Sequence, residues 1–384
     1  MNAVPKPSSK LNPETAVRER YSDAAAQREP ELCCPVDYDP QYLKVIPQEV
    51  IDRDYGCGDP SKSVRAGETV LDLGCGGGKI CFIAAQVVGP QGSVIGVDMN
   101  DEMLDLARRS QAEVSKQIGF DNLRFVKGRI QDLQVDRDRL DLYLQQSPID
   151  SEEALQRYER FVADMRQQTP LIASNSIDVV VSNCVLNLVD ADEKQQLFRE
   201  IFRVLKPGGR AVISDIVSDE HVPPAMQNDG YLWSGCISGA FQEKVFLDAF
   251  VEAGFQGVEM PVYQPLLWQV VEGIEFRSAT VIAYKFPDEA CWEHFDAVMY
   301  RGPYSSVRDD DGHEFKRGVR TAVCRKTFDK ISSPPYAQDF VTHSPAEPVH
   351  PEDAKPFACT GAQAQRHPRV TKGGEVGCTG QDCC

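Results

Sequence analysis

Hydrophobic and polar positions follow two different periods along the middle of the chain. Short apolar runs, typical of buried strands, alternate with longer segments in which apolar residues recur every three or four positions, as on one face of a helix. The strand-like runs are 69–75, 93–99, 123–130, 177–183 and 209–217, and the helix-like segments are 79–88, 102–118 and 193–205. This alternation predicts a doubly wound α/β sheet, which binds its ligand at the carboxyl ends of the strands.

The regular alternation is interrupted once and weakens near the C-terminus. Residues 134–176 are polar with a helical pattern, and we interpret them as an insertion that covers the edge of the sheet. Residues 241–284 supply a last helix and strand, whereas the periodicity weakens beyond 285. The stretch from 333 onward is rich in Pro, Gly and small polar residues, which favours a mostly disordered tail.

Composition narrows the classes of partner. The 384 residues include 58 Asp and Glu against 41 Lys and Arg, a net charge of -17, so neither nucleic acid nor an anionic membrane is an expected partner. The N-terminus lacks the apolar run of a secretory signal, and no later run approaches the length of a membrane span. We expect a cytoplasmic protein, in which the thirteen cysteines are ligands, nucleophiles or core residues rather than disulfides.

A glycine-rich turn follows the first strand. In "VLDLGCGGGK" (70–79), glycines at every second position let the backbone pass close to a ligand, and the next helix offers free N–H groups. About 20 residues later Asp98 ends the next strand, where a carboxylate can accept hydrogen bonds from two ribose hydroxyls. A dinucleotide enzyme is one interpretation of this pattern. The residues concerned are Asp72, Gly74, Gly76, Gly78 and Asp98.

The pattern D-x-G-x-G-x-G, together with "VLKPGGRAVISD" (204–215), resembles the class I S-adenosylmethionine methyltransferases over residues 68–218. The resemblance implies a Rossmann-like sheet and S-adenosylmethionine as the cofactor, with the glycine turn around its methionine moiety. In that family the residues after the third strand flank the adenine, which here are Ile130 and Gln131. Met99 and Asn183 complete the expected cofactor-binding set.

Cysteines lie where the methyl acceptor is expected. Cys184 follows the fourth strand, Cys236 lies in "LWSGCISGA" (232–240), Cys57 lies in "DYGCGDP" (54–60), and Cys33 and Cys34 form "ELCCPV" (31–36). Taken singly, a free cysteine is more often a small core residue than a ligand. The glycines beside Cys57 and Cys236 weaken that interpretation, because a core strand has little use for flanking glycines.

Three of these segments, "YGCG", "SNCVLNLV" and "LWSGCISGA", together resemble the arsenite S-adenosylmethionine methyltransferases, and the similarity runs from about residue 31 to about 284. The resemblance implies that Cys184 and Cys236 bind As(III), that Cys57 is a third thiolate, and that Cys33 or Cys34 takes part in thiol exchange. It also implies arsenite and methylarsenite as substrates, thioredoxin or glutathione as the thiol reductant, thioredoxin as a possible protein partner, and a monomer.

Elementary chemistry agrees with that implication. Arsenic(III) is a soft centre, and thiolates select soft centres over hard ones. Three sulfurs leave a lone pair on arsenic that can attack a sulfonium methyl in line, so no base is needed, and the chain has only six histidines. Holding arsenic and methyl in near-attack geometry is then the main catalytic task.

The expected organisation has five parts: 1–67 as an N-terminal extension with Cys33, Cys34 and Cys57; 68–218 as the cofactor-binding domain with 134–176 inserted; 219–284 as an arsenic-binding segment with the last sheet elements; 285–332 as a C-terminal region; and 333–384 as a flexible tail containing cysteines.

The remaining cysteines have less defined expectations. Cys75 and Cys81 are interpreted as packing residues, and Cys291, Cys324 and Cys359 as structural. For Cys378, Cys383 and Cys384, capture of arsenite and an inert tail stay equally open. "DDDGHE" (309–314) lacks the ligand run of a calcium loop and is expected to be a solvated turn.

Two alternative functions remain at this point. The chain could methylate another small molecule with its cysteines merely packed, or bind a metalloid without turnover on a relic of the fold. The intact set of Asp72, the glycines and Asp98 argues against the relic.

Overall fold

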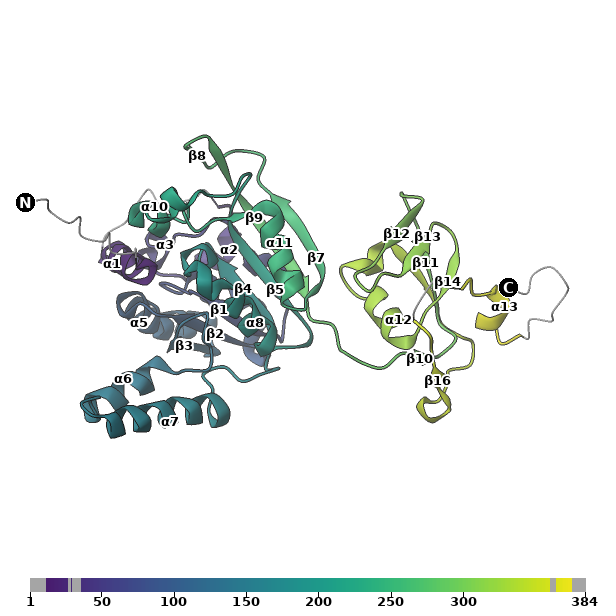
Figure 1. The fold of residues 1–384 in the computed structure, drawn as a ribbon, viewed down its shortest axis with the longest axis horizontal. Coiled ribbons are helices and arrows are strands. Elements are labelled where there is room, and N and C mark those ends of the chain that lie inside the picture. The colour runs from purple at the N-terminus through teal and green to yellow at the C-terminus, as the bar shows by residue number, and fades with distance from the viewer. Residues whose placement is uncertain (1–11, 27–28, 30–35, 360–363, 375–384) are drawn as a thin grey trace, which may run out of the picture. The chain divides into compact units, whose positions relative to one another are not determined.

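The computed structural model describes residues 12–26, 29, 36–359 and 364–374. The chain divides into two compact units, one ending at Lys285 and the other beginning at Phe286 (Figure 1). Each unit is described by itself. No helix in these described residues is long and apolar enough to cross a membrane.

The N-terminal unit is built on one mixed sheet with the order β3-β2-β1-β4-β5-β9-β7. The strands β1 to β5 are mutually parallel, and β9 and β7 add an antiparallel edge. The reversal of order beside β1 is the switch point at which doubly wound sheets bind ligands. The strands are β1 Thr69–Leu73, β2 Ser93–Asp98, β3 Leu123–Lys127, β4 Ile177–Asn183, β5 Leu205–Ser218, β7 Gln256–Tyr263 and β9 Ile274–Tyr284, with β6 Phe241–Gln242 and β8 Gln269–Val271 attached.

Both faces of this sheet are buried. Successive residues of β1 belong to different cores: Val70 packs with the α4 and α5 side, whereas Leu71 packs with the α8 and α11 side. Strands covered on both faces are continuous apolar runs, which is why the five strand-like runs were recognisable in the sequence. The helices are α4 Lys79–Val88, α5 Asp101–Ile118, α8 Lys194–Val204 and α11 Glu243–Glu252.

The N-terminal segment packs on the sheet domain as three α-helices, α1 Pro13–Ala26, α2 Pro40–Leu43 and α3 Gln48–Asp52. Ala24 and Ala25 of α1 are buried against Tyr55 and against Met103 of α5. The Ser22 hydroxyl donates to Glu102 (3.0 Å) and accepts from the Asn100 amide (2.9 Å), which joins α1 to the start of α5. The segment expected as an extension is therefore part of the domain's packing.

Residues 134–176 contain two helices, α6 Arg137–Gln146 and α7 Glu152–Gln168, with a small core of their own. That core contains Val135, Leu140 and Met165. Lys127, at the end of the edge strand β3, bridges to Asp141 of α6 (2.8 Å) and to Asp101 of α5 (2.9 Å).

The C-terminal unit is mainly β structure around a compact core that includes Val298, Phe315 and Phe340. Strand β15 lies within the region expected to be a flexible tail, and it pairs with β11 over four residues. The expectation of a disordered tail from residue 333 is therefore wrong for the described residues, because Phe340 contributes to the core. The elements are β10 Trp292–Glu293, β11 Ala297–Tyr300, β12 Ser306–Arg308, β13 Glu314–Lys316, β14 Arg320–Ala322, α12 Arg325–Ile331, β15 Phe340–His343, β16 Lys355–Pro356 and α13 Pro368–Thr371.

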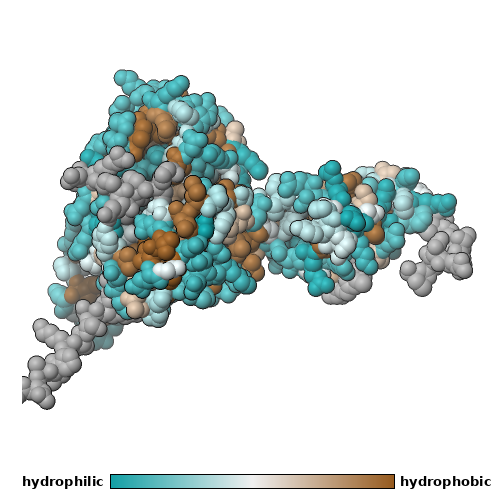
Figure 2. Space-filling model, turned by 90° about the horizontal axis from the view of Figure 1, so that it is seen from above, coloured by the Kyte–Doolittle hydropathy of each residue, from teal (hydrophilic) through white to brown (hydrophobic). Residues whose placement is uncertain are grey.

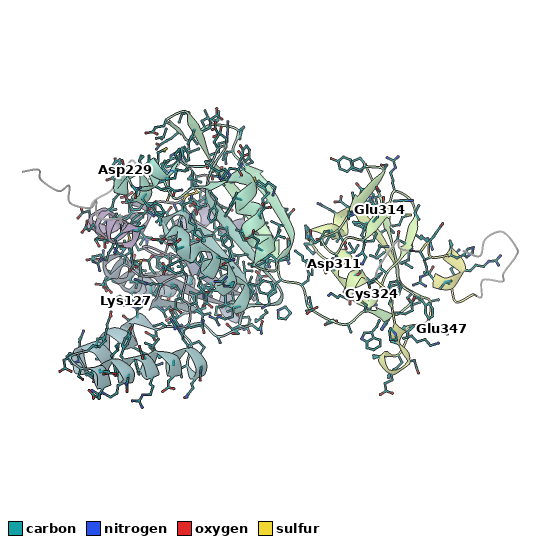
Figure 3. All side chains as sticks on the ribbon, viewed as in Figure 1. Lys127, Asp229, Asp311, Glu314, Cys324 and Glu347 are labelled. Carbon is teal, nitrogen blue, oxygen red and sulfur yellow. A yellow bond between two sulfur atoms is a disulfide. The ribbon has the colours of Figure 1, made fainter. Side chains whose placement is uncertain are left out.

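The acidic turn at 309–314 agrees with its expectation in part, because four of its six residues are exposed. The side chains of Asp309 and His313, however, are almost fully buried, and their Oδ2 and Nδ1 atoms lie 2.9 Å apart. The buried Lys330 ammonium lies 3.1 Å from Asp309 and 2.5 Å from Asp311, which is labelled in Figure 3. The turn between β12 and β13 is thus solvated at its tip and held at its base by a buried cation.

The face shown in Figure 2 is mostly hydrophilic, with separate hydrophobic patches on the N-terminal unit. The largest aromatic cluster lies inside, between α8 and α11. Its rings are in edge or stacked contact at centroid distances of 4.8–5.8 Å, and its members are Phe198, Phe202, Phe241, Phe246, Phe250 and Phe255.

We predict that Phe250→Ala lowers the free energy of unfolding by about 3–5 kcal/mol, because a fully buried ring is replaced by a cavity. Its neighbour Val251 is 55% exposed, so Val251→Ala should change that free energy by at most ~0.5 kcal/mol. Urea denaturation followed by tryptophan fluorescence measures both. Equal losses in the two variants would contradict the assigned core.

Candidate active site

A cavity of about 590 Å³ opens at the carboxyl ends of β1, β2 and β4. Most residues predicted for cofactor binding line it, and Gly78 does not. Gly78 instead begins α4 with a φ of 90° and packs against Phe125, so its role is to start the helix. The predicted residues in the wall are Asp72, Gly74, Gly76, Asp98, Met99, Ile130, Gln131 and Asn183, together with Cys184.

The glycine turn leaves room for a ligand. Gly74 and Gly76 have φ values of 68° and 51°, a region that favours glycine. A Cβ on Gly74 would meet Val185 at 2.4 Å, whereas a Cβ on Gly76 would meet no atom within 4 Å and would project into open space. The Gly76 N–H donates to Asp98 (2.8 Å), which fixes the turn against the end of β2.

Asp98 keeps capacity for a ligand. Its Oδ1 accepts from the Asn100 N–H (2.9 Å) and its Oδ2 from the Gly76 N–H. The Met99 backbone contributes a third hydrogen bond to this carboxylate, and two carboxylate oxygens offer about four acceptor positions, so Asp98 can still accept from a ligand. This geometry is compatible with the expectation that Asp98 binds the ribose.

Carboxylates give the cavity a negative wall. Asp54, which the sequence did not single out, lines it beside Asp72 and Asp98, and its Oδ2 lies 2.6 Å from the Lys79 ammonium. Burial raises the pKa of Asp72 to about 7; the charges of Asp54 and Asp98 add to this, and a hydrogen bond from the Cys81 thiol (3.2 Å) opposes it. Such a wall favours a ligand that carries positive charge.

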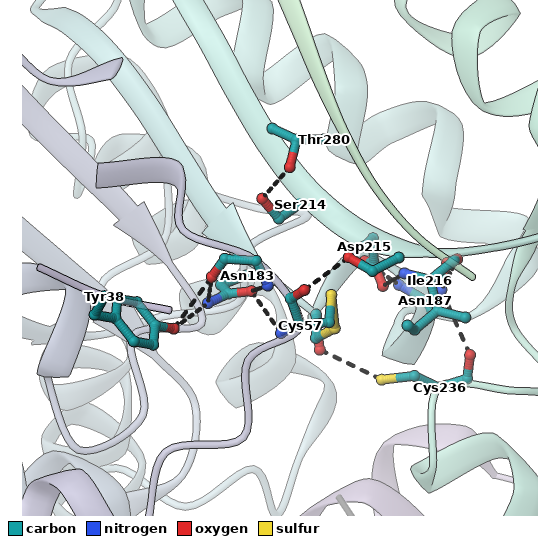
Figure 4. Close-up of a disulfide and its surroundings, with 12 residues drawn as sticks. Tyr38, Cys57, Asn183, Asn187, Ser214, Asp215, Ile216, Cys236 and Thr280 are labelled. Carbon is teal, nitrogen blue, oxygen red and sulfur yellow. Dashed lines mark hydrogen bonds between the residues drawn. A yellow bond between two sulfur atoms is a disulfide. The ribbon is translucent and has the colours of Figure 1, made fainter. Parts of the chain in front are cut away.

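Three predicted cysteines meet beside this cavity (Figure 4). Cys57 lies in the loop after α3, Cys184 directly follows β4, and Cys236 is the second residue after α10 Gly230–Ser234. Cys57 and Cys184 form a disulfide, and the Cys236 thiol donates to the Cys184 carbonyl at 3.4 Å. All three are buried in one apolar cluster.

Two of the cysteines have a left-handed backbone. The φ values are 59° for Cys184 and 63° for Cys236, and cysteine rarely adopts this region. Hydrogen bonds hold the two residues in place, from Cys184 N–H to the Ser214 carbonyl (2.8 Å) and from Cys236 N–H to the Trp233 carbonyl (3.1 Å). Unfavourable backbone of this kind is concentrated at functional sites, which adds an observation that the sequence did not contain.

The loop of Cys57 is held by Asn183. The side-chain oxygen of Asn183 accepts hydrogen bonds from the backbone N–H groups of Cys57 (2.9 Å) and Gly58 (3.0 Å). Its side-chain nitrogen donates to the Gly58 carbonyl (2.7 Å) and to the Tyr38 hydroxyl (3.1 Å). Asn183 borders the cavity, but its side chain is used to position Cys57, which differs from the expected cofactor contact.

The glycines on both sides of Cys57 avoid steric clashes with the sheet. A Cβ on Gly56 would lie 2.0 Å from the Asn183 amide nitrogen, and a Cβ on Gly58 would lie 2.5 Å from the Ser214 hydroxyl. The Y-G-C-G segment therefore needs glycine on both sides of the cysteine to approach the sheet.

Aromatic residues that the sequence did not single out enclose the sulfurs. A small space of about 10 Å³ lies between Cys184, Cys236, Tyr21, Tyr55 and Trp268, among others. Tyr21, Tyr55 and Cys184 also line the large cavity, so the two spaces share walls. Burial raises the pKa of Tyr21, and the neighbouring Cys236 side chain adds to this through its charge and a hydrogen bond.

A buried carboxylate, Asp215, lies within 4.8 Å of the Cys57 and Cys184 sulfurs. It accepts from the N–H groups of Ile216 (2.8 Å) and Asn187 (3.2 Å), and burial raises its pKa to about 6. The sequence contained a signal for Asp215, because burying a carboxylate in an otherwise apolar strand costs free energy unless hydrogen bonds or a charged partner compensate.

The other predicted cysteines are placed as follows. Cys75 and Cys81 are buried at the glycine turn, and their sulfurs lie against Gly96 of β2, where a Cβ would meet them at 2.8 and 2.9 Å. Cys33 and Cys34, like Cys378, Cys383 and Cys384, lie outside the described residues.

Comparison with known proteins identifies relatives of both units. Residues 64–165 and 150–254 match a family described as a methyltransferase domain, and residues 287–376 match a domain of unknown function (DUF8838). The chain is 31% identical to an arsenite methyltransferase of Aquipseudomonas alcaligenes over 80% of this chain and 83% of that protein. It is 28% identical to the arsenite methyltransferase of Homo sapiens, over 78% and 73% of the two chains.

One solved structure is also similar. The crystal structure of an arsenic(III) S-adenosylmethionine methyltransferase from Chlamydomonas reinhardtii aligns with a TM-score of 0.55 at 25% identity, covering 82% of this chain and 99% of that one. The predicted class I methyltransferase fold is thereby confirmed.

We predict that Asn183→Ala releases the Cys57 loop. Loss of the carbonyl that holds two backbone N–H groups costs about 2 kcal/mol, so Cys57 of the reduced protein should be alkylated roughly tenfold faster or more. Peptide mass spectrometry after timed iodoacetamide treatment measures this rate. Asn228→Ala, at an exposed site, is the matched control, and an unchanged Cys57 rate in Asn183→Ala would contradict the positioning role.

Proposed function

The chain belongs to the arsenite methyltransferases, and from this premise we propose that it transfers methyl groups from S-adenosylmethionine to trivalent arsenic bound by Cys57, Cys184 and Cys236. One observation carries the assignment of the acceptor site. Three cysteines from distant parts of the chain are buried in one apolar cluster, and two of them, Cys184 and Cys236, line a small space that shares walls with the large cavity.

The large cavity fits the cofactor. Its glycine turn leaves open space at Gly76, Asp98 has free lone pairs for ribose hydroxyls, and its carboxylates suit a molecule with a sulfonium and an ammonium group. Bound there, S-adenosylmethionine supplies a methyl group activated by its positive sulfur. Ile130 and Gln131 are proposed to flank the adenine, and Met99 to lie beside the ribose.

Arsenic binding requires the three thiols in their reduced form. Each new bond between a cysteine sulfur and arsenic releases one hydroxide of arsenite as water, with the proton that the thiol gives up. Methylarsenite, which already carries one methyl group, uses two thiols in the same way. Soft sulfur ligands select arsenic over the harder cations of the cell.

The lone pair of sulfur-bound arsenic then attacks the methyl carbon. The bond between carbon and arsenic forms as the bond between carbon and the sulfonium sulfur breaks, and arsenic becomes formally pentavalent. Its return to the trivalent state takes two electrons, which Cys57 and Cys184 can supply by forming the disulfide that they make in the structure. A thiol reductant, glutathione or thioredoxin, reduces this disulfide for the next turnover, with Cys33 or Cys34 as an exchange thiol.

The apolar and aromatic surroundings favour this reaction. Tyr21 and Tyr55 lie between the two spaces with their rings at right angles and 6.1 Å apart, and they exclude water from the transfer path. The nucleophile has no proton to lose, so the site needs geometry more than a base. The requirement for reduced thiols supports a cytoplasmic location, and we propose a monomer with thioredoxin as its protein partner.

We predict that the wild type methylates arsenite with labelled S-adenosylmethionine and a thiol, and that Cys57→Ser, Cys184→Ser and Cys236→Ser each lose methyl transfer while keeping wild-type affinity for the cofactor. The large cavity keeps its carboxylates and glycine turn in all three variants, and only the sulfur ligands change. Radioactive product analysis and calorimetric titration with the cofactor measure the two properties.

The same experiment separates the alternatives. If the wild type binds the cofactor and leaves arsenite unchanged, the acceptor is another small molecule. If Cys184→Ser retains full activity, arsenic is not held by this sulfur.

We also predict that affinity for S-adenosylmethionine rises with pH. Asp72, with its pKa near 7, is mostly neutral at pH 5.5 and mostly negative at pH 7.5, and the negative form attracts the cationic cofactor. The affinity should rise roughly 25-fold over this interval, in proportion to the ionised fraction of Asp72. Asp72→Asn should bind at every pH as weakly as the wild type binds at pH 5.5. An equal rise in Asp72→Asn would assign the pH dependence to another group.

A further inference from the structure

The C-terminal unit brings a second set of three thiols together. The sulfurs of Cys291, Cys324 and Cys359 all lie within 4.8 Å of one another, and none of the three is in a disulfide. Cys324, labelled in Figure 3, is fully buried, whereas Cys291 and Cys359 are partly exposed. A ligand could therefore reach the set from the solvent and be held from the inside.

Three separate segments build this cluster. Cys291 directly precedes β10 and Cys359 follows β16, and these strands pair through Trp292 with Pro356 and Glu293 with Lys355. A hydrogen bond from the Phe357 N–H to the Cys291 carbonyl (2.9 Å) extends the pairing toward both cysteines.

The third sulfur is fixed by its own hydrogen bonds. Cys324 stands directly before α12, and its sulfur accepts from the Thr327 N–H at 3.4 Å and lies 3.2 Å from the Thr327 hydroxyl. One backbone donor therefore faces this sulfur, and the hydroxyl can donate to it as well when the sulfur is a thiolate. The cluster is assembled by backbone pairing and capping, not by packing of cysteines as small apolar residues.

The ligand set indicates what the cluster would bind. Among the described residues, no histidine, aspartate or glutamate joins the three cysteines within the same 4.8 Å limit. Structural zinc sites use four protein ligands, and the described part of this unit supplies three. A centre that makes three bonds to sulfur and keeps a lone pair matches it, and soft sulfur ligands favour thiophilic elements.

We propose that Cys291, Cys324 and Cys359 form a second binding site for trivalent arsenic. The choice of arsenic rests on the proposed function, since arsenite is the thiophilic species that this enzyme would meet. Binding forms three bonds between arsenic and sulfur and releases three waters from arsenite, with no oxidation or reduction. The three cysteines all belong to the C-terminal unit, whereas the glycine turn and Asp98 belong to the N-terminal unit.

The test uses the full chain with the active-site sulfurs removed, Cys57→Ser/Cys184→Ser/Cys236→Ser. This parent variant is incubated with sodium arsenite, separated by gel filtration and assayed for arsenic per chain, and X-ray absorption counts the sulfurs around arsenic. We expect about one arsenic bound by three sulfurs. Adding Cys291→Ser, Cys324→Ser and Cys359→Ser should remove it.

Two further variants of the parent control this result. Cys378→Ser/Cys383→Ser/Cys384→Ser removes the same number of thiols from the same unit and should keep the bound arsenic. Because Cys324 is fully buried and its change could unfold the unit, Cys359→Ser alone is also measured. Cys359 is partly exposed, so this variant should keep the thermal unfolding midpoint and lose the three-sulfur arsenic signal.

The outcomes decide between clear alternatives. No arsenic on the parent, or loss of arsenic only with the Cys378 set, would overturn the proposal. Zinc bound by the cluster and not displaced by arsenite would assign it to zinc instead. Methyl transfer by the wild type is measured separately, so an enzyme inactive on arsenite whose parent variant still binds arsenic would contradict the proposed function and leave the second site standing.

Discussion

The carboxyl end of β4 is the constraint on which the rest of the site depends. Two consecutive residues there have different roles. The Asn183 side chain holds the loop of Cys57, and Cys184 adopts a left-handed backbone conformation in which its sulfur is bonded to that of Cys57. The strand itself is fixed between β1 and β5 in the middle of the sheet. A buried central strand moves little, so two of the three sulfurs take their positions from the most rigid part of the domain.

The sequence was sufficient for the parts of the molecule that repeat a simple rule. Buried parallel strands are continuous apolar runs, and the glycine turn with Asp98 has a fixed spacing, so the sheet and the cofactor cavity were predictable. The order of Cys57, Cys184 and Cys236 was visible through their motifs. The left-handed backbone of Cys184 and Cys236 was not, because the sequence around a cysteine does not favour that region, and backbone hydrogen bonds formed in the fold maintain it.

The misses have physical causes of the same kind. Tyr21, Tyr55 and Trp268 are ordinary aromatic residues until three segments come together around the sulfurs. The C-terminal unit has short strands of two to four residues, too short to show a period, and its core depends on pairing between distant segments such as β11 and β15. Lys330, outside the acidic turn in sequence, forms the buried ion pair with Asp309 that the sequence of the turn alone did not indicate.

Helix α1 contacts both halves of the site. On one side Ser22 bonds to Asn100 and Glu102 at the start of α5, and on the other Arg20 donates to the Tyr231 carbonyl (3.0 Å) in α10, just before Cys236. If the ligands of both spaces bind more tightly when this helix is docked, each increases the affinity for the other by the same factor. A single shared helix would then couple methyl donor and acceptor, and would limit occupancy of the enzyme by one substrate without the other.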